Sequence, residues 1–241
     1  MKPFAVRTPS LYTIVSAVSL WLIAAAPVHA STVTPGPLDL QTGVPYSWKV
    51  VMGGDFDLAH YHGDVGAKSW AEPLNPVGAK GWTHTSDWTA LDLTGMSGPT
   101  ILTLELGRVD PPTPSELFPA FTLFSGWQAD APSGVNHTWN NTGNPSWTPS
   151  LTYIDHQANA GGPNGTDSGT GEVTLSRSWV LTPGLYTLNY GGNPSFDLGQ
   201  TGLHGFAATL ATQPVPVPAA VYLFGSGLIG LAGLARRKFS A

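Results

Sequence analysis

The side chains best suited to chemistry lie close together, in residues 60–64 (HYHGD). In an extended strand alternate side chains share a face, so His60, His62 and Asp64 would project together. Two imidazoles and a carboxylate suit Zn²⁺ or another transition metal, and His84 can supply a fourth ligand from a neighbouring strand. The alternative is a surface segment beside a glycine turn, with histidines that hydrogen-bond to water. The pattern therefore predicts either a metal site or a solvated strand.

Acidic residues offer a second kind of site, built from oxygen ligands for Ca²⁺. One group is Asp55 with Asp57, and the other is the Asn-, Asp- and Gly-rich segment that holds Asp155 and Asp167. Neither follows the spacing of an EF-hand or of a calcium-binding nonapeptide repeat. Solvated turn carboxylates are the competing interpretation of both groups.

Aromatic and amide side chains around Trp139 offer a third kind of site, for glycan. Indole rings stack on sugar faces and amides pair with hydroxyls, which suits Trp139, Asn140 and Trp147. The competing interpretation is structural, because eight of the nine tryptophans lie in the central part of the chain and most must fill its core. Trp82 and Trp88 are assigned to that core.

Enzyme signatures are absent from the sequence. It has no Gly-x-Ser-x-Gly, HExxH or P-loop motif, and no cysteine for a nucleophile, a thiolate zinc site or a disulfide. The tripeptide at 167–169 (DSG) matches aspartic proteases but occurs once, whereas their mechanism needs two carboxylates. We therefore expect a non-catalytic protein. A glycan-cleaving enzyme stays a weaker alternative, because the spacing of its two carboxylates is spatial rather than sequential.

Short strands separated by turns must position these residues. The chain contains 29 Gly and 22 Pro, which disfavour long helices, and apolar residues alternate with polar ones over short runs. In residues 101–106, for example, Leu102, Leu104 and Leu106 share one face. The expected strands are 44–52, 88–93, 101–106, 121–127, 172–176, 185–190 and 206–210. This pattern predicts an all-β protein, an antiparallel β-sandwich or jelly roll.

The two ends of the chain differ from its centre. Lys2 and Arg7 precede an apolar run, 11–26, and small residues lead to Ala30, which is the layout of a signal peptide cleaved after Ala30. Residues 219–235 carry no charge, and a basic cluster follows them. A helix of that length spans about 25 Å, slightly less than a bilayer hydrocarbon core of about 30 Å. A short helix can still cross, because the bilayer thins locally and long basic side chains at the helix end reach the headgroups.

Charge distribution places the central part outside the cytoplasm. Basic residues stay on the cytoplasmic side of a membrane helix, so residues 31–218 would lie on the other side. These residues hold five basic and all fifteen acidic side chains, a net charge of −10. Such a surface repels nucleic-acid phosphates, which excludes nucleic-acid binding. We expect a signal peptide at 1–30, a β-sandwich at 31–212, a proline-rich spacer at 213–218, and a transmembrane helix with a basic tail at 219–241.

The C-terminal run resembles the sorting signal of PEP-CTERM proteins: a proline motif, a short apolar helix and a basic cluster, in that order. Its residues are Val215, Pro216, Val217 and Pro218, followed after the apolar run by Arg236, Arg237 and Lys238. Valine stands at position 217, where the name-giving motif has an acidic residue.

The resemblance implies processing by an exosortase, a membrane enzyme of exopolysaccharide-producing Gram-negative bacteria, which transfers the protein to the cell surface or extracellular matrix. Together with signal peptidase, exosortase would be a processing partner. We expect a non-catalytic component or binder of the extracellular polysaccharide, with a surface metal-binding protein as the alternative.

Overall fold

The computed structural model describes residues 30–36, 44, 46–66, 69–70, 81–109, 117–128, 138–159, 171–193, 202–216 and 224. The predicted signal peptide, apart from Ala30, and the predicted C-terminal helix, apart from Phe224, lie outside this part. Within it, no helix is both long enough and apolar enough to cross a membrane.

The described residues form strands and one short 3₁₀ helix, as the sequence predicts for an all-β protein. They are β1 (Thr32–Pro35), β2 (Tyr46–Val51), β3 (Leu58–Gly66), β4 (Gly81–Trp82), η1 (Thr83–Thr85), β5 (Asp87–Asp92), β6 (Thr100–Arg108), β7 (Phe118–Ser125), β8 (Thr138–Trp139), β9 (Thr152–Ala158), β10 (Thr174–Leu181), β11 (Leu185–Asn193) and β12 (Leu203–Pro214).

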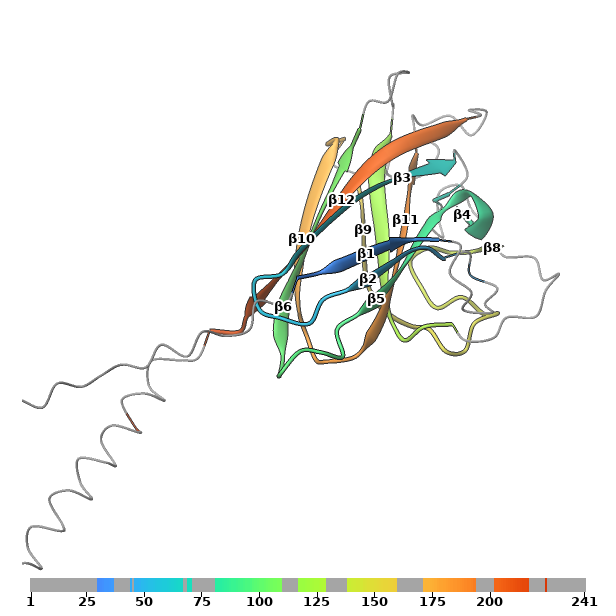
Figure 1. Ribbon diagram of the computed structural model, residues 1–241. Coiled ribbons are helices and arrows are strands. Elements are labelled where there is room, and N and C mark those ends of the chain that lie inside the picture. The colour runs from blue at the N-terminus through green and yellow to red at the C-terminus, as the bar shows by residue number, and fades with distance from the viewer. Residues whose placement is uncertain are drawn as a thin grey trace, which may run out of the picture.

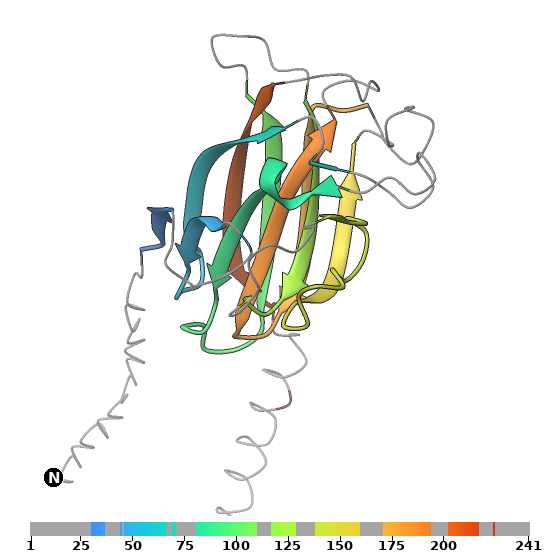
Figure 2. The ribbon, with the colours of Figure 1, turned by 90° about the vertical axis from the view of Figure 1, so that its right-hand side faces the viewer.

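Two sheets lie face to face and form a β-sandwich (Figure 1, Figure 2). One sheet has the order β1-β2-β5-β11-β7-β9 and the other has the order β10-β6-β12-β3, while β4 and β8 form a separate pair. Every pairing within the two large sheets is antiparallel except that of β2 with β5, which is parallel. The predicted sandwich is confirmed in this part of the chain.

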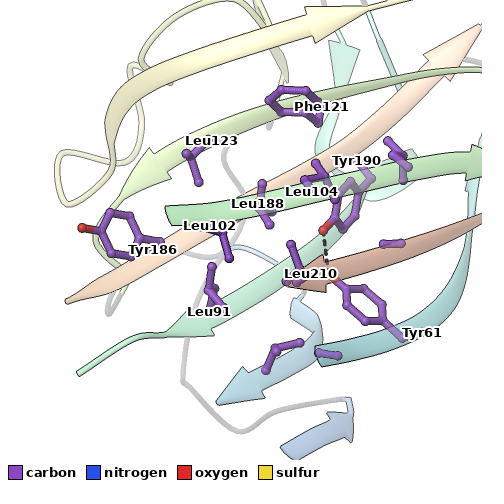
Figure 3. Close-up of a cluster of buried hydrophobic side chains, with 14 of the residues drawn as sticks. Tyr61, Leu91, Leu102, Leu104, Phe121, Leu123, Tyr186, Leu188, Tyr190 and Leu210 are labelled. Atoms are coloured by element: carbon purple, nitrogen blue, oxygen red, sulfur yellow. Dashed lines mark hydrogen bonds between the residues drawn. The ribbon is translucent and has the colours of Figure 1, made fainter. Parts of the chain in front are cut away.

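The core fills the space between the two sheets (Figure 3). On β6, Leu102, Leu104 and Leu106 are buried while Glu105 is exposed, so the predicted alternation is confirmed. Leu188 and Leu123 from the facing sheet belong to the same cluster. Each buried leucine contributes about 1.5–3 kcal/mol relative to an exposed one.

The two tryptophans assigned to packing have different environments. Trp88 is fully buried on β5, as predicted. Trp82 is 46% exposed, so its assignment to the core is wrong. The reason is that Trp82 belongs to β4, which has two residues and pairs only with β8, outside the two packed sheets.

Candidate metal-binding site

The edge strand β3 presents the predicted histidines to solvent. It pairs with β12 on one side only, and its residues alternate between core and surface. The buried positions include Ala59, Tyr61 and Val65, and the exposed positions include His60, His62 and Asp64. The extended conformation that the metal prediction required is therefore present.

His60 and His62 face each other on this surface. Their Nε2 atoms are 3.1 Å apart, and the rings meet edge to face with centroids 4.7 Å apart. Two imidazole nitrogens about 2.05 Å from one metal ion are about 2.9 Å apart at a right angle and about 3.4 Å apart at a tetrahedral angle. The observed separation lies between these values. The contact is an N–H···N hydrogen bond, in which one Nε2–H points at the other Nε2, so an ion bound by both nitrogens would replace this bond and its proton.

Thr209 on β12 orients the first of these rings. Its Oγ1 lies 2.9 Å from His60 Nδ1, and the two residues are direct partners in the register of β3 with β12. A hydroxyl that accepts a hydrogen bond from Nδ1–H leaves the lone pair of Nε2 available to a metal. The hydroxyl of Thr209 fixes the orientation of the His60 ring, and it can pair with either tautomer because a hydroxyl both donates and accepts.

The other two predicted ligands do not complete a cluster. Asp64 is exposed on the same face of β3 and borders, with His62 and Phe206, a hollow of about 200 Å³. His84 lies in η1, which precedes β5 of the other sheet. Among the residues that the structure describes, no three His, Asp or Glu side chains form a group able to hold a metal. The structure therefore brings His60 and His62 together without Asp64 or His84.

A buried carboxyl group lies beneath β3, at a residue that sequence analysis missed. Gly63 has no side chain, and a Cβ added there would lie 2.3 Å from Asp87 Oδ2 and 2.6 Å from the ring of Phe206. Asp87 is only 5% exposed. Desolvation raises its pKa to about 7, and the negative charge of Asp64 adds to the rise. The sequence signal was an acid directly before the apolar strand that begins at Trp88.

Two of the described calcium candidates already have structural roles. Asp57 Oδ2 accepts hydrogen bonds from the amides of Gly53 and Gly54, at 3.0 and 3.1 Å. Asp155 Oδ2 accepts bonds from Arg177 Nε at 2.8 Å and from the indole of Trp179 at 2.9 Å. These carboxylates hold a turn and connect β9 to β10.

The other two calcium candidates are Asp55 and Asp167. Asp55 is exposed in the turn before β3. Asp167 lies outside the described residues. The calcium site stays a prediction.

The predicted glycan residues are likewise part of the local structure. Asn140 Oδ1 accepts bonds from the amide and the hydroxyl of Thr142, at 3.1 and 2.8 Å. Trp147 is partly buried and packs against a second core cluster that contains Trp88 and Phe124. The backbone of Trp139 pairs with Gly81, and its side chain lies outside the described set. No aromatic platform is formed by the described side chains of this group.

The sorting-signal residues fall mostly outside the described part. Val215 and Pro216 follow β12 and are exposed. Val217, Pro218 and the basic cluster 236–238 lie beyond it.

Comparison with known proteins does not assign this chain to a family. The sequence matches no family model and no curated protein. CorA, a surface-associated copper-binding protein important in copper acquisition by Methylomicrobium album BG8, has a TM-score of 0.45 at 17% identity, over 63% of this chain and 92% of that one. The secreted protein MopE of Methylococcus capsulatus, in which an oxidized tryptophan facilitates copper binding, has a TM-score of 0.40 at 15% identity, over 65% and 84%.

A third solved structure, the Yersinia pseudotuberculosis-derived mitogen, has a TM-score of 0.30 at 11% identity, over 68% of this chain and 92% of that one. Likenesses at this level assign no function.

Proposed function

We propose that this protein binds a transition-metal ion at its surface through His60 and His62. The observation that supports the proposal is the 3.1 Å separation of their Nε2 atoms on an exposed face of an edge strand. Imidazole suits zinc, copper, iron and nickel, and among divalent ions of this series copper binds such ligands most tightly. We therefore propose Cu²⁺ as the preferred ion.

Two protein ligands leave coordination positions open to water or to solutes. A structural zinc site is closed by four protein ligands, whereas an open site exchanges its ion and its other ligands. The exposure of both histidines permits this exchange. The proposed role is therefore reversible capture of an ion, not stabilisation of the fold by metal, and not catalysis.

Calorimetric titration of the full chain in mild detergent with Cu²⁺, and separately with Zn²⁺, tests the proposal. We expect one equivalent of Cu²⁺, bound more tightly than Zn²⁺, and a loss of at least tenfold in affinity in His60→Ala or His62→Ala. His84→Ala is the matched control and should bind as the unaltered protein does. Stoichiometric binding that survives both substitutions on β3, or no binding at all, would contradict the proposal.

We also propose that the protein is exported, and that residues 219–235 tether it to the membrane before exosortase acts. The uncharged run, its basic flank and the preceding proline motif support this proposal. Fractionation of producing cells tests it: the full-length chain should float with membranes, and the processed form should appear at the surface or in the matrix. A full-length chain found in the soluble cytosolic fraction would contradict it.

A role in the extracellular polysaccharide remains a second proposal, based on the resemblance of the C-terminal run. Its test is binding of the purified protein to the producer's own polysaccharide, compared with Trp139→Ala and Trp147→Ala. Loss of binding in Trp139→Ala with an intact fold would support it. Sugar release in the same assay would favour the glycan-cleaving alternative instead.

A further inference from the structure

The turn before β3 exposes an aromatic residue in a strained conformation. Phe56 has a φ of 69° and is 75% exposed. A positive φ is unfavourable for a bulky side chain, and glycine or asparagine normally occupies such a position. Burial in the core does not explain a phenylalanine here. An aromatic ring held in solvent at a strained position therefore indicates contact with something outside the domain.

Hydrogen bonds fix this turn to the last part of β12. The amide of Phe56 donates to the carbonyl of Thr212 at 2.9 Å, and the amide of Asp57 donates to Thr212 Oγ1 at 3.0 Å. The hydroxyl of Thr212 in turn donates to the carbonyl of Gly54 at 2.8 Å. The position of Phe56 is thus set relative to the strand from which the C-terminal segment leaves the domain.

Both described ends of the domain lie beside the same turn. Ser31, the first residue after the predicted signal-peptide cleavage, donates from its hydroxyl to the carbonyl of Leu58, and Thr32 pairs with Val51. At the other end of the chain, β12 finishes at Pro214, next to Thr100. Figure 1 shows β12 crossing the sandwich to reach this end. The first and last described residues of the sandwich, Ser31 and Pro214, therefore lie at one end of the domain.

The distance to the predicted membrane helix is short. Six residues, 213–218, separate Thr212 from Ala219, and the seven Cα-to-Cα steps between them span at most about 25 Å when extended. Further exposed apolar side chains lie at the same end: Leu58, Val180 and Val215. Asp55 is the exposed acidic neighbour of Phe56, which disfavours an anionic surface and suits a zwitterionic one.

We infer that Phe56 is a membrane-contact residue: it inserts into the interface of the bilayer that residues 219–235 enter and holds this end of the sandwich against lipid. This inference depends on the tether proposed above. Apolar and aromatic side chains at the headgroup level stabilise such contacts. The occupant of the exposed surface is the outer leaflet of the protein's own membrane, at the end of the domain where β12 finishes and the C-terminal run follows.

A single reporter can test the contact, because the chain contains no cysteine. Phe56→Cys in the full chain, labelled with nitrobenzoxadiazole and reconstituted in phosphatidylcholine vesicles, reports the polarity at position 56. Leu203→Cys is the matched control, because Leu203 is 70% exposed and lies at the opposite end of β12. Vesicle flotation in the same sample reports the tether independently of the label.

The two positions should behave differently. We expect the label at 56 to shift to shorter wavelength by at least 10 nm and to be quenched at least twofold by doxyl-labelled lipid, while the label at 203 behaves as in water. A chain that floats with a water-like label at 56 overturns the contact and leaves the tether in place. A chain that does not float overturns both.

Discussion

The hydroxyls of Tyr61 and Tyr190 form a 2.6 Å hydrogen bond across the core, from β3 in one sheet to β11 in the other (Figure 3). Both phenols are buried, and desolvation raises both pKa values, so both stay protonated at physiological pH. Tyr61 lies between His60 and His62 in the chain. The bond therefore attaches the strand that carries His60 and His62, the proposed metal ligands, to the opposite sheet.

Removing one hydroxyl of this pair should destabilise the fold. Tyr61→Phe leaves the Tyr190 hydroxyl buried without its partner, and an unsatisfied buried polar group costs about 1–3 kcal/mol. In Tyr61→Phe/Tyr190→Phe both polar groups are gone, so the double variant should lose less stability than the sum of the two single variants. Urea unfolding of all four proteins measures the coupling. Additive losses would show that the bond contributes nothing specific.

Stability should depend on pH through Asp87. Its pKa is raised from 3.8 to about 7, so the folded state binds its proton more tightly than the unfolded state. This contribution is fully present below about pH 4, falls as pH rises through about 7, and is lost above that. The rise of the Asp87 pKa from 3.8 to about 7 corresponds to roughly 4 kcal/mol of unfolding free energy.

Asp87→Asn removes this titration. The free energy of unfolding of the variant, minus that of the unaltered protein, should rise by a few kcal/mol between pH 4 and pH 8. Urea unfolding over that range measures the difference. A constant difference would show that the carboxyl group does not titrate in this window.

Gly63 should tolerate no side chain. A methyl group there would overlap Asp87 Oδ2 and the ring of Phe206, and overpacking of this kind typically costs about 1–3 kcal/mol. Thermal unfolding of Gly63→Ala measures the loss. Gly98→Ala is the control, because nothing lies within 4 Å of an added Cβ at Gly98, and its stability should change by less than about 0.5 kcal/mol. Equal stability of the two variants would contradict the prediction.

Sequence alone predicted β2, β5, β6, β7, β10, β11 and β12, because alternation of apolar residues reports which face of a strand is buried, but it missed β1 and β9 at the two edges of the larger sheet. Leu102 and Leu104 on β6 are an example. It did not predict the parallel pairing of β2 with β5, because that pairing depends on how the chain returns after passing through β3 in the facing sheet. Strand pairing between distant segments has no signature in local periodicity.

The same limit applies to the site. Alternation placed His60 and His62 on one face, which the structure shows. It could not show which side chain lies beside them, because the register of β3 with β12 brings Thr209 opposite His60 from 149 residues away. His84 was the nearest histidine available in sequence, but it lies in η1, before a strand of the other sheet.

That register leads to a prediction about Thr209. Its hydroxyl lies 2.9 Å from His60 Nδ1 and fixes the orientation of the His60 ring. Residues that orient a metal ligand through a hydrogen bond typically contribute 10–100-fold to metal affinity. Thr209→Val keeps the size and β-branching of the side chain and removes the hydroxyl. We therefore expect Cu²⁺ affinity to fall at least tenfold while the stability of the fold changes little, as measured by calorimetric titration beside urea unfolding.

The matched control for Thr209→Val is Thr103→Val. Thr103 lies on the same face of the same sheet and bonds to Ser178 at 2.8 Å, away from the histidines. Its loss should leave Cu²⁺ affinity unchanged. Thr209→Ser restores a hydroxyl and should recover most of the affinity, which separates the hydrogen bond from the packing of the methyl group. Equal Cu²⁺ affinity in the two valine variants would contradict the prediction. It would mean that the orientation of the His60 ring, and with it the Cu²⁺ affinity, does not depend on Thr209.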